Sequence, residues 1–387
     1  MKNKTLLALL FMCPVALASC GTTKNYAEHL DDYVHEMDYR DGFNILQLTD
    51  IHWNYNTSTP ASKIYLDKVL AEADRKIKKD LQPNNPNAKI DLVELTGDQF
   101  MLANSYHVKS FIEYFEAKAK EYGFMYAVIW GNHDHHGLYN PNWLSGKFRS
   151  AEHAIYRDEE DNLYGRSNFV INLKQGGETK WQIANLDSGA SFSETAISIS
   201  RDYDYIHRDQ TEFWIREHNL VGKDTPAIAY YHIPQQENLI AWNENHDDDL
   251  TNDHKSKFFK LEKFGDNGNA EYASDFLNRA IDEGHNLKAA FMGHAHNIDW
   301  TVDYRDKVTV GLGVKTGPEL YFAHISVNDT DPNVQEGLAS TGITEDFDLL
   351  GASLVTLENT TGKFGLQHLY LNERGSGDFV RWVDYNA

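Results

Sequence analysis

The sequence predicts an α/β fold, because strand-like and helix-like segments alternate through its first part. Three short apolar runs, separated by two segments with helical spacing of apolar residues, occupy 43–48, 90–96 and 125–130. A polar motif follows each run directly, beginning at Asp50, Gly97 or Gly131. Since the carboxyl ends of parallel strands share one edge of a sheet, these motifs are expected to gather there.

The remaining elements follow from the same patterns. Between the strands, helices are expected at 61–80, where Pro83 and Pro86 follow, and at 105–122. Two runs around Gly176 and Gly177 predict a hairpin, at 168–173 and 181–186. Later segments predict helices at 209–219 and 271–284 and strands at 227–231 and 287–292. From about Val308 onward, alternating apolar and polar residues suggest an antiparallel sheet that closes the domain.

The composition supports a packed, acidic globular protein. The chain has 387 residues, of which 41% are hydrophobic and 12% aromatic, so a sizeable core is feasible. Lys and Arg number 36 against 58 Asp and Glu, giving a net charge of −22. Such a surface lacks the positive field that attracts polyanions, so we expect no binding of duplex nucleic acid. Any phosphate affinity must therefore be local.

The N-terminus has the pattern of a bacterial lipoprotein signal. Lys2 and Lys4 precede an apolar run from Leu6 to Ala18, which is too short to span a bilayer. Cys20 then falls where cleavage and acylation are expected, although an ordinary secretory signal with a chance cysteine is the alternative. We therefore expect a signal peptide at 1–19, a tether and lead-in at 20–42, and one domain at 43–387. The protein would be lipid-anchored on the extracytoplasmic face of the cell membrane.

Five motifs, each placed after an apolar run, carry the chemistry. Together they contain three Asp, one Asn and five His, namely Asp50, His52, Asp98, Asn132, His133, Asp134, His232, His294 and His296. Each motif alone is weak, because a single buried histidine is usually a satisfied core residue. Oxygen and imidazole ligands in this mixture suit two adjacent divalent metal ions of the first transition row. Two such ions are a standard device for attacking a phosphate ester.

This ordered set of motifs resembles the calcineurin-like metallophosphoesterase family, from about Phe43 to Asp299. The resemblance implies a four-layer α/β/β/α sandwich with mixed central sheets. It also implies one metal held by Asp50, His52 and His296, and another held by Asn132, His232 and His294, with Asp98 and a hydroxide bridging them. His133 would protonate the leaving oxygen or stabilise the transition state, oriented by a hydrogen bond to Asp134. Two divalent ions against two carboxylates and a hydroxide would leave the site near +1, which attracts a phosphate dianion.

Finer features resemble the purple-acid-phosphatase-like branch of that family. They lie at 186–189, 205–214, 232–234 and 313–317. Met101 stands where the purple enzymes carry a metal-binding tyrosine, and His52 stands where they have no histidine. We therefore expect a colourless or weakly coloured site with Mn, Fe(II) or Zn.

Several nearby residues allow two interpretations. Trp53, Asn54 and Tyr55 could line the pocket or pack in a loop, and His135 and His136 could reach the phosphate or face solvent. Asp187 could touch substrate or cap a turn. The acidic run from His246 to His254 could bind a separate cation, but it lacks the glycine of a calcium loop.

The expected function is hydrolysis of a small phosphorylated substrate, with a monoester or nucleotide favoured over a diester. A non-catalytic surface lipoprotein that captures a ligand on the same fold is the alternative from another class. An extracellular nuclease is a third reading, which the acidity of the chain disfavours.

Overall fold

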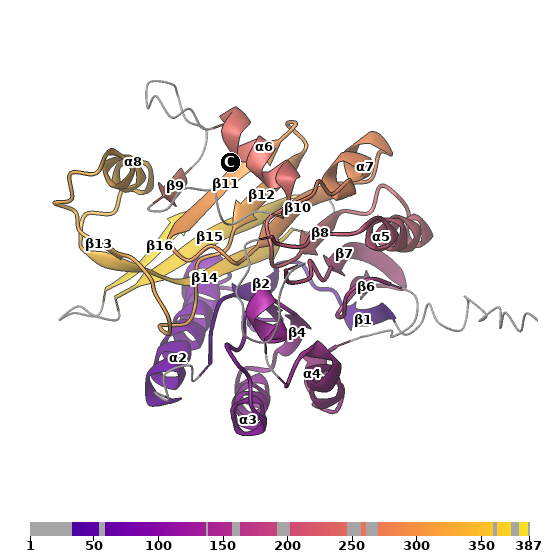
Figure 1. Ribbon diagram of the computed structural model, residues 1–387, viewed down its shortest axis with the longest axis horizontal. Coiled ribbons are helices and arrows are strands. Elements are labelled where there is room, and N and C mark those ends of the chain that lie inside the picture. The colour runs from indigo at the N-terminus through magenta and orange to yellow at the C-terminus, as the bar shows by residue number, and fades with distance from the viewer. Residues whose placement is uncertain are drawn as a thin grey trace, which may run out of the picture.

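The computed structural model describes residues 33–53, 59–136, 138–156, 163–191, 202–245, 257–260, 270–358, 362–372 and 379–385. The predicted signal peptide, Cys20, Asn54, Tyr55 and the run from His246 to His254 lie outside these residues. Two mixed sheets stack face to face, and helices cover both outer faces (Figure 1). This is the four-layer α/β/β/α sandwich that the sequence and the family resemblance predicted.

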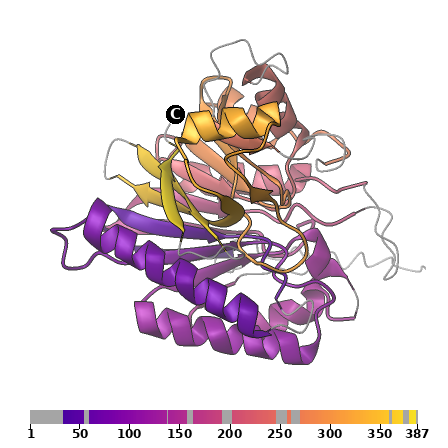
Figure 2. The same cartoon turned by 90° about the vertical axis from the view of Figure 1, so that its left-hand side faces the viewer.

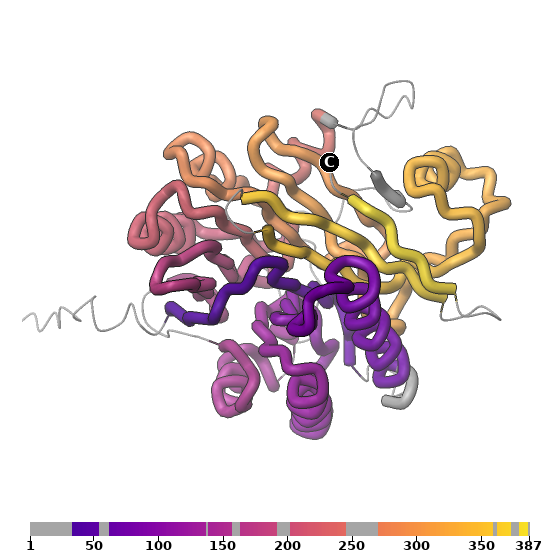
Figure 3. Tube along the Cα trace, turned by 180° about the vertical axis from the view of Figure 1, so that it is seen from behind, coloured from indigo at the N-terminus to yellow at the C-terminus, as the bar shows by residue number. Residues whose placement is uncertain are grey.

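The first sheet carries the first three motifs. Its strand order is β16-β15-β14-β2-β3-β4-β5, and β13 pairs with β14. The strands are β2 (Phe43–Leu48), β3 (Leu92–Thr96), β4 (Met125–Ile129), β5 (Ala154–Ile155), β13 (His324–Ile325), β14 (Phe347–Leu357), β15 (Phe364–Leu371) and β16 (Val380–Asp384). Strands β2 to β5 run parallel, whereas β14 joins β2 in antiparallel fashion. The C-terminal strands therefore extend the sheet that begins the domain, as seen from behind in Figure 3.

The second sheet carries the last two motifs. Its order is β1-β6-β7-β8-β10-β12-β11-β9. The strands are β1 (Val34–Asp38), β6 (Phe169–Gln175), β7 (Glu178–Asn185), β8 (Ala227–Tyr230), β9 (Lys257–Lys260), β10 (Leu287–Met292), β11 (Ile298–Tyr304) and β12 (Val308–Leu312). Strands β6 and β7 form the predicted hairpin, and β8 and β10 lie parallel as neighbours.

Helices cover the sheets on both sides. On the first sheet lie α2 (Thr59–Lys76), α3 (Ser105–Tyr122) and α4 (Pro141–Phe148), and on the second lie α5 (Arg208–Val221), α6 (Gln236–Asn245) and α7 (Phe276–Asp282). Figure 2 shows α2 and α3 running side by side along one outer face. The seventh labelled helix, α8 (Pro332–Thr341), buries Val334 and Leu338 against the core between the sheets. No helix in the described part of the chain is long and apolar enough to cross a membrane.

Three apolar clusters correspond to the three contacts between layers. Alternation along β3 shows how one strand serves two of them. Val93 and Leu95 pack against the outer helices, whereas Leu92 faces the other sheet. Glu94, which lies between Val93 and Leu95, is therefore an acidic residue on the face between the two sheets.

The fold begins earlier than the sequence predicted. Residues Val34–Asp38, within the predicted tether and lead-in over 20–42, form β1, an edge strand paired in parallel with β6. The strand contains His35, Glu36 and Asp38, and this polar sequence concealed it. Helix α7 is also shorter than the predicted 271–284.

Candidate metal centre

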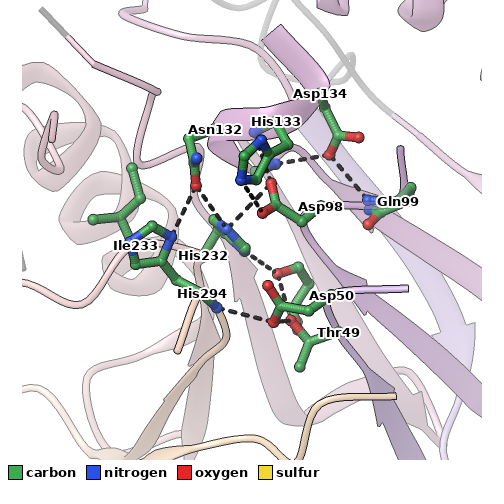
Figure 4. Close-up of polar contacts among 12 residues, drawn as sticks. Thr49, Asp50, Asp98, Gln99, Asn132, His133, Asp134, His232, Ile233 and His294 are labelled. Atoms are coloured by element: carbon green, nitrogen blue, oxygen red, sulfur yellow. Dashed lines mark hydrogen bonds and ion pairs between the residues drawn. The ribbon is translucent and has the colours of Figure 1, made fainter. Parts of the chain in front are cut away.

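All five motifs meet at the carboxyl ends of β2, β3, β4, β8 and β10, and most of their residues appear in Figure 4. Asp50, His52, Asp98 and His296 offer ligand atoms within 4.8 Å of one another. A second group with the same property contains Asp98, His232 and His294. Asp98 belongs to both groups, so the geometry brings together two adjacent ligand sets that share one carboxylate.

In the first group, the ring nitrogens of His52 and His296 lie close to each other and to the carboxylates of Asp50 and Asp98. Nε2 of His52 and Nε2 of His296 are 3.2 Å apart, and the latter is 3.3 Å from Oδ1 of Asp50. Oδ2 of Asp98 lies 3.9 Å from Nε2 of His52. Neither that oxygen nor Oδ1 of Asp50 receives a hydrogen bond, although both are buried. Buried polar atoms nearly always have partners. A divalent cation bound by these two oxygens and the two imidazole nitrogens would supply the missing partner.

The second group includes an amide oxygen. Oδ1 of Asn132 lies 3.2 Å from Nε2 of His232 and 2.8 Å from Nδ1 of His294. Nε2 of His232 is also 3.4 Å from Oδ1 of Asp98. Nδ1 of His232 donates to the carbonyl of Thr96 at 2.8 Å, which leaves Nε2 available as a ligand. This oxygen and nitrogen set also fits a divalent cation.

Each carboxylate is held through one oxygen. Oδ2 of Asp50 accepts hydrogen bonds from the Thr49 hydroxyl at 2.8 Å and from the His294 amide at 3.0 Å. Oδ1 of Asp98 accepts the His133 amide at 2.8 Å. The other oxygen of each group is thereby directed toward the imidazoles, so the protein orients its ligands in advance.

The charges of these buried groups depend strongly on one another. Burial opposes ionisation of His232, but the carboxylates of Asp98 and Asp50 outweigh it and raise the pKa of His232 to about 9. Burial and the neighbouring His232 lower the pKa of His294 to about 3. Asp98 titrates well below its usual pKa because His232 and His133 together overcome its burial. The cluster therefore holds anionic carboxylates beside three imidazoles whose pKa is lowered, those of His52, His294 and His296, whereas His232 would release a proton when a metal binds.

Four of the predicted ligands have left-handed backbone conformations. Their φ angles are 53° at Asp50, 48° at His52, 54° at Asp98 and 76° at His294. Such a conformation costs a non-glycine residue about 1–2 kcal/mol. Paired backbone hydrogen bonds hold two of these turns, because Asp50 donates to Gly97 at 3.1 Å and His52 donates to Asp98 at 3.0 Å. Strain of this kind gathers at functional sites.

Two motif glycines permit close packing around the ligands. A Cβ atom on Gly131 would lie 2.3 Å from Oδ1 of Asp98, and one on Gly293 would lie 1.9 Å from Oγ1 of Thr49. Neither Gly131 nor Gly293 therefore has room for a side chain. The glycine of each motif is therefore required by the positions of neighbouring ligands.

His133 lies beside the shared carboxylate and is partly exposed. Its Nε2 is 3.9 Å from Oδ2 of Asp98, and 16% of its side chain is accessible to solvent. The predicted hydrogen bond to Asp134 is wrong. Nδ1 of His133 instead lies 3.2 Å from Nδ1 of His136.

Asp134 points away from His133 and toward the backbone (Figure 4). Its oxygens accept the amides of Phe100 at 2.8 Å, Gly131 at 2.9 Å and Gln99 at 3.3 Å. This carboxylate thus joins the loop after β3 to the loop after β4. Burial and the charge of Asp98 raise the pKa of Asp134 to about 8.

Most of the residues with two possible interpretations have a structural role. Trp53 is buried in the core, and its indole donates to the Ser110 hydroxyl at 2.9 Å. Asp187 accepts the backbone amides of Arg166 and Gly189, as a turn-capping residue does. His136 is buried beside His133 rather than solvated.

Sequence reasoning missed the segment that supports the first ligand loop. Nζ of the buried Lys315 donates to the carbonyl of Asp50 at 2.6 Å. Thr316 exchanges hydrogen bonds with Thr49, through its amide at 2.8 Å and its hydroxyl at 3.1 Å. Residues 313–317 resembled a branch of the family, but their distance along the chain from Asp50 gave no sign of this contact.

Two tyrosine rings lie against the candidate ligands. The ring of Tyr203 makes an edge contact with His294, with centroids 4.4 Å apart. The ring of Tyr321 lies 4.4 Å from that of His296. Tyr203 is 9% exposed and Tyr321 is 55% exposed, so Tyr321 presents the larger surface to solvent.

Comparison with known proteins identifies the family. Residues 43–297 match the family model described as calcineurin-like phosphoesterase. The chain is 26% identical over 217 residues to Phosphatase DCR2 of Saccharomyces cerevisiae, which covers 53% of this chain and 36% of that protein. It is 22% identical over 281 residues to "Probable inactive purple acid phosphatase 28" of Arabidopsis thaliana, covering 67% of this chain and 66% of that protein. The chain thus spans about a third of the first relative and just under two thirds of the second. Since the family model covers well over half of this chain, the protein belongs to the calcineurin-like phosphoesterase family.

Proposed function

We propose that this protein is a dinuclear metal-dependent phosphoesterase that favours monoesters or nucleotides over diesters. The observation that carries the proposal is the pair of adjacent ligand groups sharing Asp98. Asp50, His52 and His296 would hold one ion, and Asn132, His232 and His294 would hold the other. When bound, two divalent ions acidify a water molecule for attack and neutralise charge on the phosphate oxygens.

His133 has the position of a general acid. Its ring nitrogen lies beside Asp98 but the side chain remains partly open to solvent, where an ester oxygen could approach. In this proposal His133 donates a proton to the leaving oxygen, and Asp134 fixes the loop that carries it.

The acidity of the chain supports a small substrate. A net charge of −22 repels a long polyanion, which argues against the extracellular nuclease. A non-catalytic ligand-binding protein on this fold is the remaining rival, and the name of the Arabidopsis relative includes "inactive". Both ligand groups and His133 are present here, which supports catalysis over that rival.

The first test is hydrolysis of p-nitrophenyl phosphate beside bis-p-nitrophenyl phosphate. The purified protein is loaded with Mn²⁺, Zn²⁺ or Fe²⁺, the ions that we propose for the site, and bound metal is counted by atomic emission. Two ions per chain and faster monoester turnover, both reduced in Asp98→Asn, are expected. Preference for the diester would overturn the substrate assignment. Absence of both metal binding and turnover would favour the ligand-binding rival.

We also propose that Cys20 carries a lipid anchor at the extracytoplasmic face of the cell membrane. The proposal rests on the apolar run that ends two residues before Cys20. Metabolic labelling with a radioactive fatty acid should mark the full-length protein but not Cys20→Ala. Equal labelling of both would exclude this anchor.

A further inference from the structure

Tyr321 is an exposed aromatic residue next to a buried candidate ligand. Its ring lies 4.4 Å from the ring of His296 at an interplanar angle of 40°. His296 is only 3% exposed, whereas Tyr321 is 55% exposed. An exposed aromatic ring beside a candidate reaction centre offers a surface for stacking.

The backbone on both sides of Tyr321 is fixed. On one side, the Gly317 amide donates to Asp50, and a Cβ on Gly317 would lie 1.9 Å from the carbonyl oxygen of Ile51. On the other side, Phe322 is 8% exposed and belongs to the core beneath α2 and α3. The segment that carries Tyr321 is therefore held by packing at Gly317, four residues earlier, and at the adjacent Phe322.

The turn before Tyr321 is strained. Leu320 has a φ of 65°, in the left-handed region that a leucine rarely adopts. Such a conformation persists only where the surrounding structure holds it in place. This turn places the Tyr321 ring against His296.

A continuous row of ring contacts leads from Tyr321 to His133. His296 contacts His52 with centroids 5.1 Å apart, and His52 contacts His133 at 5.3 Å. In the proposed function, His133 meets the leaving oxygen of the ester. His52 and His296 are buried, whereas His133 and Tyr321 at the two ends of the row are open to solvent. A leaving group of nucleoside size that meets His133 would therefore reach the Tyr321 ring from the solvent side.

Local charge favours a neutral leaving group. Glu319, two residues before Tyr321, is 5% exposed and lies close enough to the buried Lys315 to influence its ionisation. A second phosphate near Tyr321 would meet this carboxylate on a chain of net charge −22. A neutral planar group, such as an aryl ring or the base of a nucleoside monophosphate, avoids that repulsion.

We propose that Tyr321 forms a subsite that binds the planar aromatic leaving group of a phosphate monoester. This inference rests on the proposed function and narrows its substrate class to aryl and nucleoside monoesters. Tyr321 would set specificity, while the metal ligands and His133 would serve every ester alike.

The test compares two ligands that share one anion. Phenylphosphonate and methylphosphonate present the same phosphonate group, and only phenylphosphonate carries a ring. Their dissociation constants are measured by calorimetry on the full-length, metal-loaded protein, with Tyr321→Leu, Tyr321→Phe and Tyr272→Leu beside it. Tyr272 is a matched control because it is 57% exposed and its ring contacts that of Tyr205, with centroids 6.0 Å apart.

We expect the parent protein to prefer phenylphosphonate. The preference should fall about 5-fold in Tyr321→Leu, within the roughly 2- to 12-fold range of a single aromatic contact, and persist in Tyr321→Phe and Tyr272→Leu. The ratio of kcat/KM for phenyl phosphate over glycerol 2-phosphate should fall in parallel. An unchanged preference in Tyr321→Leu would overturn the subsite, as would an equal loss in Tyr272→Leu. Failure of the loaded protein to bind either phosphonate would overturn the proposed function as well.

Discussion

His133 is the residue whose position argues most directly for a chemical step. It lies beside Asp98 without belonging to either ligand group. We predict that His133→Asn keeps the metal content of the parent protein but lowers kcat for an alkyl phosphate by about 10²- to 10⁴-fold, the usual contribution of a general acid. The loss for p-nitrophenyl phosphate should be smaller, because its leaving oxygen needs little protonation. Steady-state kinetics with both esters and metal analysis check this, and equal losses would exclude the acid role.

The structure gives Asp134 a different role from the one predicted from the sequence, because its carboxylate binds backbone amides instead of His133. Asp134→Ala would leave the buried amides of Gln99, Phe100 and Gly131 without their acceptor. We expect the free energy of unfolding to fall by about 1–3 kcal/mol or more, since each unsatisfied buried donor is costly. Urea unfolding in EDTA measures this. An unchanged stability with a lowered kcat would restore the role of orienting His133.

At the residue scale, the identities of the site were predictable but their conformations were not. The order of motifs after apolar runs located Asp50, Asp98 and His232, because strand ends place polar residues at one edge. The left-handed backbone of Asp50 was not predictable, since nothing in its neighbours marks it. Tyr321 was hidden for another reason, as its contact with the site depends on the distant pairing of Thr316 with Thr49.

Among the elements, α3 shows how local signals define a helix. Asn104 accepts the amides of Tyr106 at 3.0 Å and His107 at 2.9 Å, and Gly123 ends the helix in a left-handed conformation. The predicted span of 105–122 is confirmed to the residue. Helix α8 also has a side-chain cap, in which Asp331 accepts the amide of Asn333, but its short apolar face did not distinguish it from a loop.

The asparagines that precede α3 and α4 give a matched pair of variants. We predict that Asn104→Ala lowers the free energy of unfolding by about 1 kcal/mol, because it removes the cap of α3. Asn140 occupies the corresponding position before α4 but makes no side-chain capping hydrogen bond, so Asn140→Ala should change it by less than about 0.5 kcal/mol. Chemical unfolding of both variants measures the difference. Equal effects would show that the capping bonds of Asn104 add nothing to stability.

At the scale of the whole molecule, polar side chains join the two sheets. Asp299 on β11 accepts hydrogen bonds from Tyr370 on β15 and from Tyr385 at the end of β16, and its carboxylate lies 2.9 Å from Nδ1 of His368. All four side chains are buried. These partners lie far apart in the sequence, so only the assembled sandwich satisfies them. Periodicity placed apolar residues on both faces of the sheets, but it carried no information about such pairings.

Glu94 is a buried acid of a different kind on the same inter-sheet face. Neither of its carboxylate oxygens has a hydrogen-bond partner. Burial raises its pKa well above the ordinary value of 4.5, and the nearby amide of Asn185 offsets this only in part. Tyr230 lies on the opposite sheet. Burial raises its pKa, and the nearby Glu94 raises it further. The native protein therefore holds Glu94 in its protonated form at pH values where the unfolded chain has released the proton.

That difference makes stability depend on pH in a definite direction. Below pH 4.5 Glu94 is protonated in both the native and the unfolded protein, so it does not change the free energy of unfolding with pH. Above it, the unfolded state binds fewer protons than the native state, so the contribution to stability falls by about 1.4 kcal/mol per pH unit until the native pKa is reached. Glu94→Gln cannot ionise, so its stability relative to the parent should rise with this slope. Urea unfolding in EDTA at pH 5, 6 and 7 measures it, with Glu113→Gln, which removes an exposed charge, as the control. A constant difference across this range would show that Glu94 is ionised in the native protein and that a cationic partner compensates it.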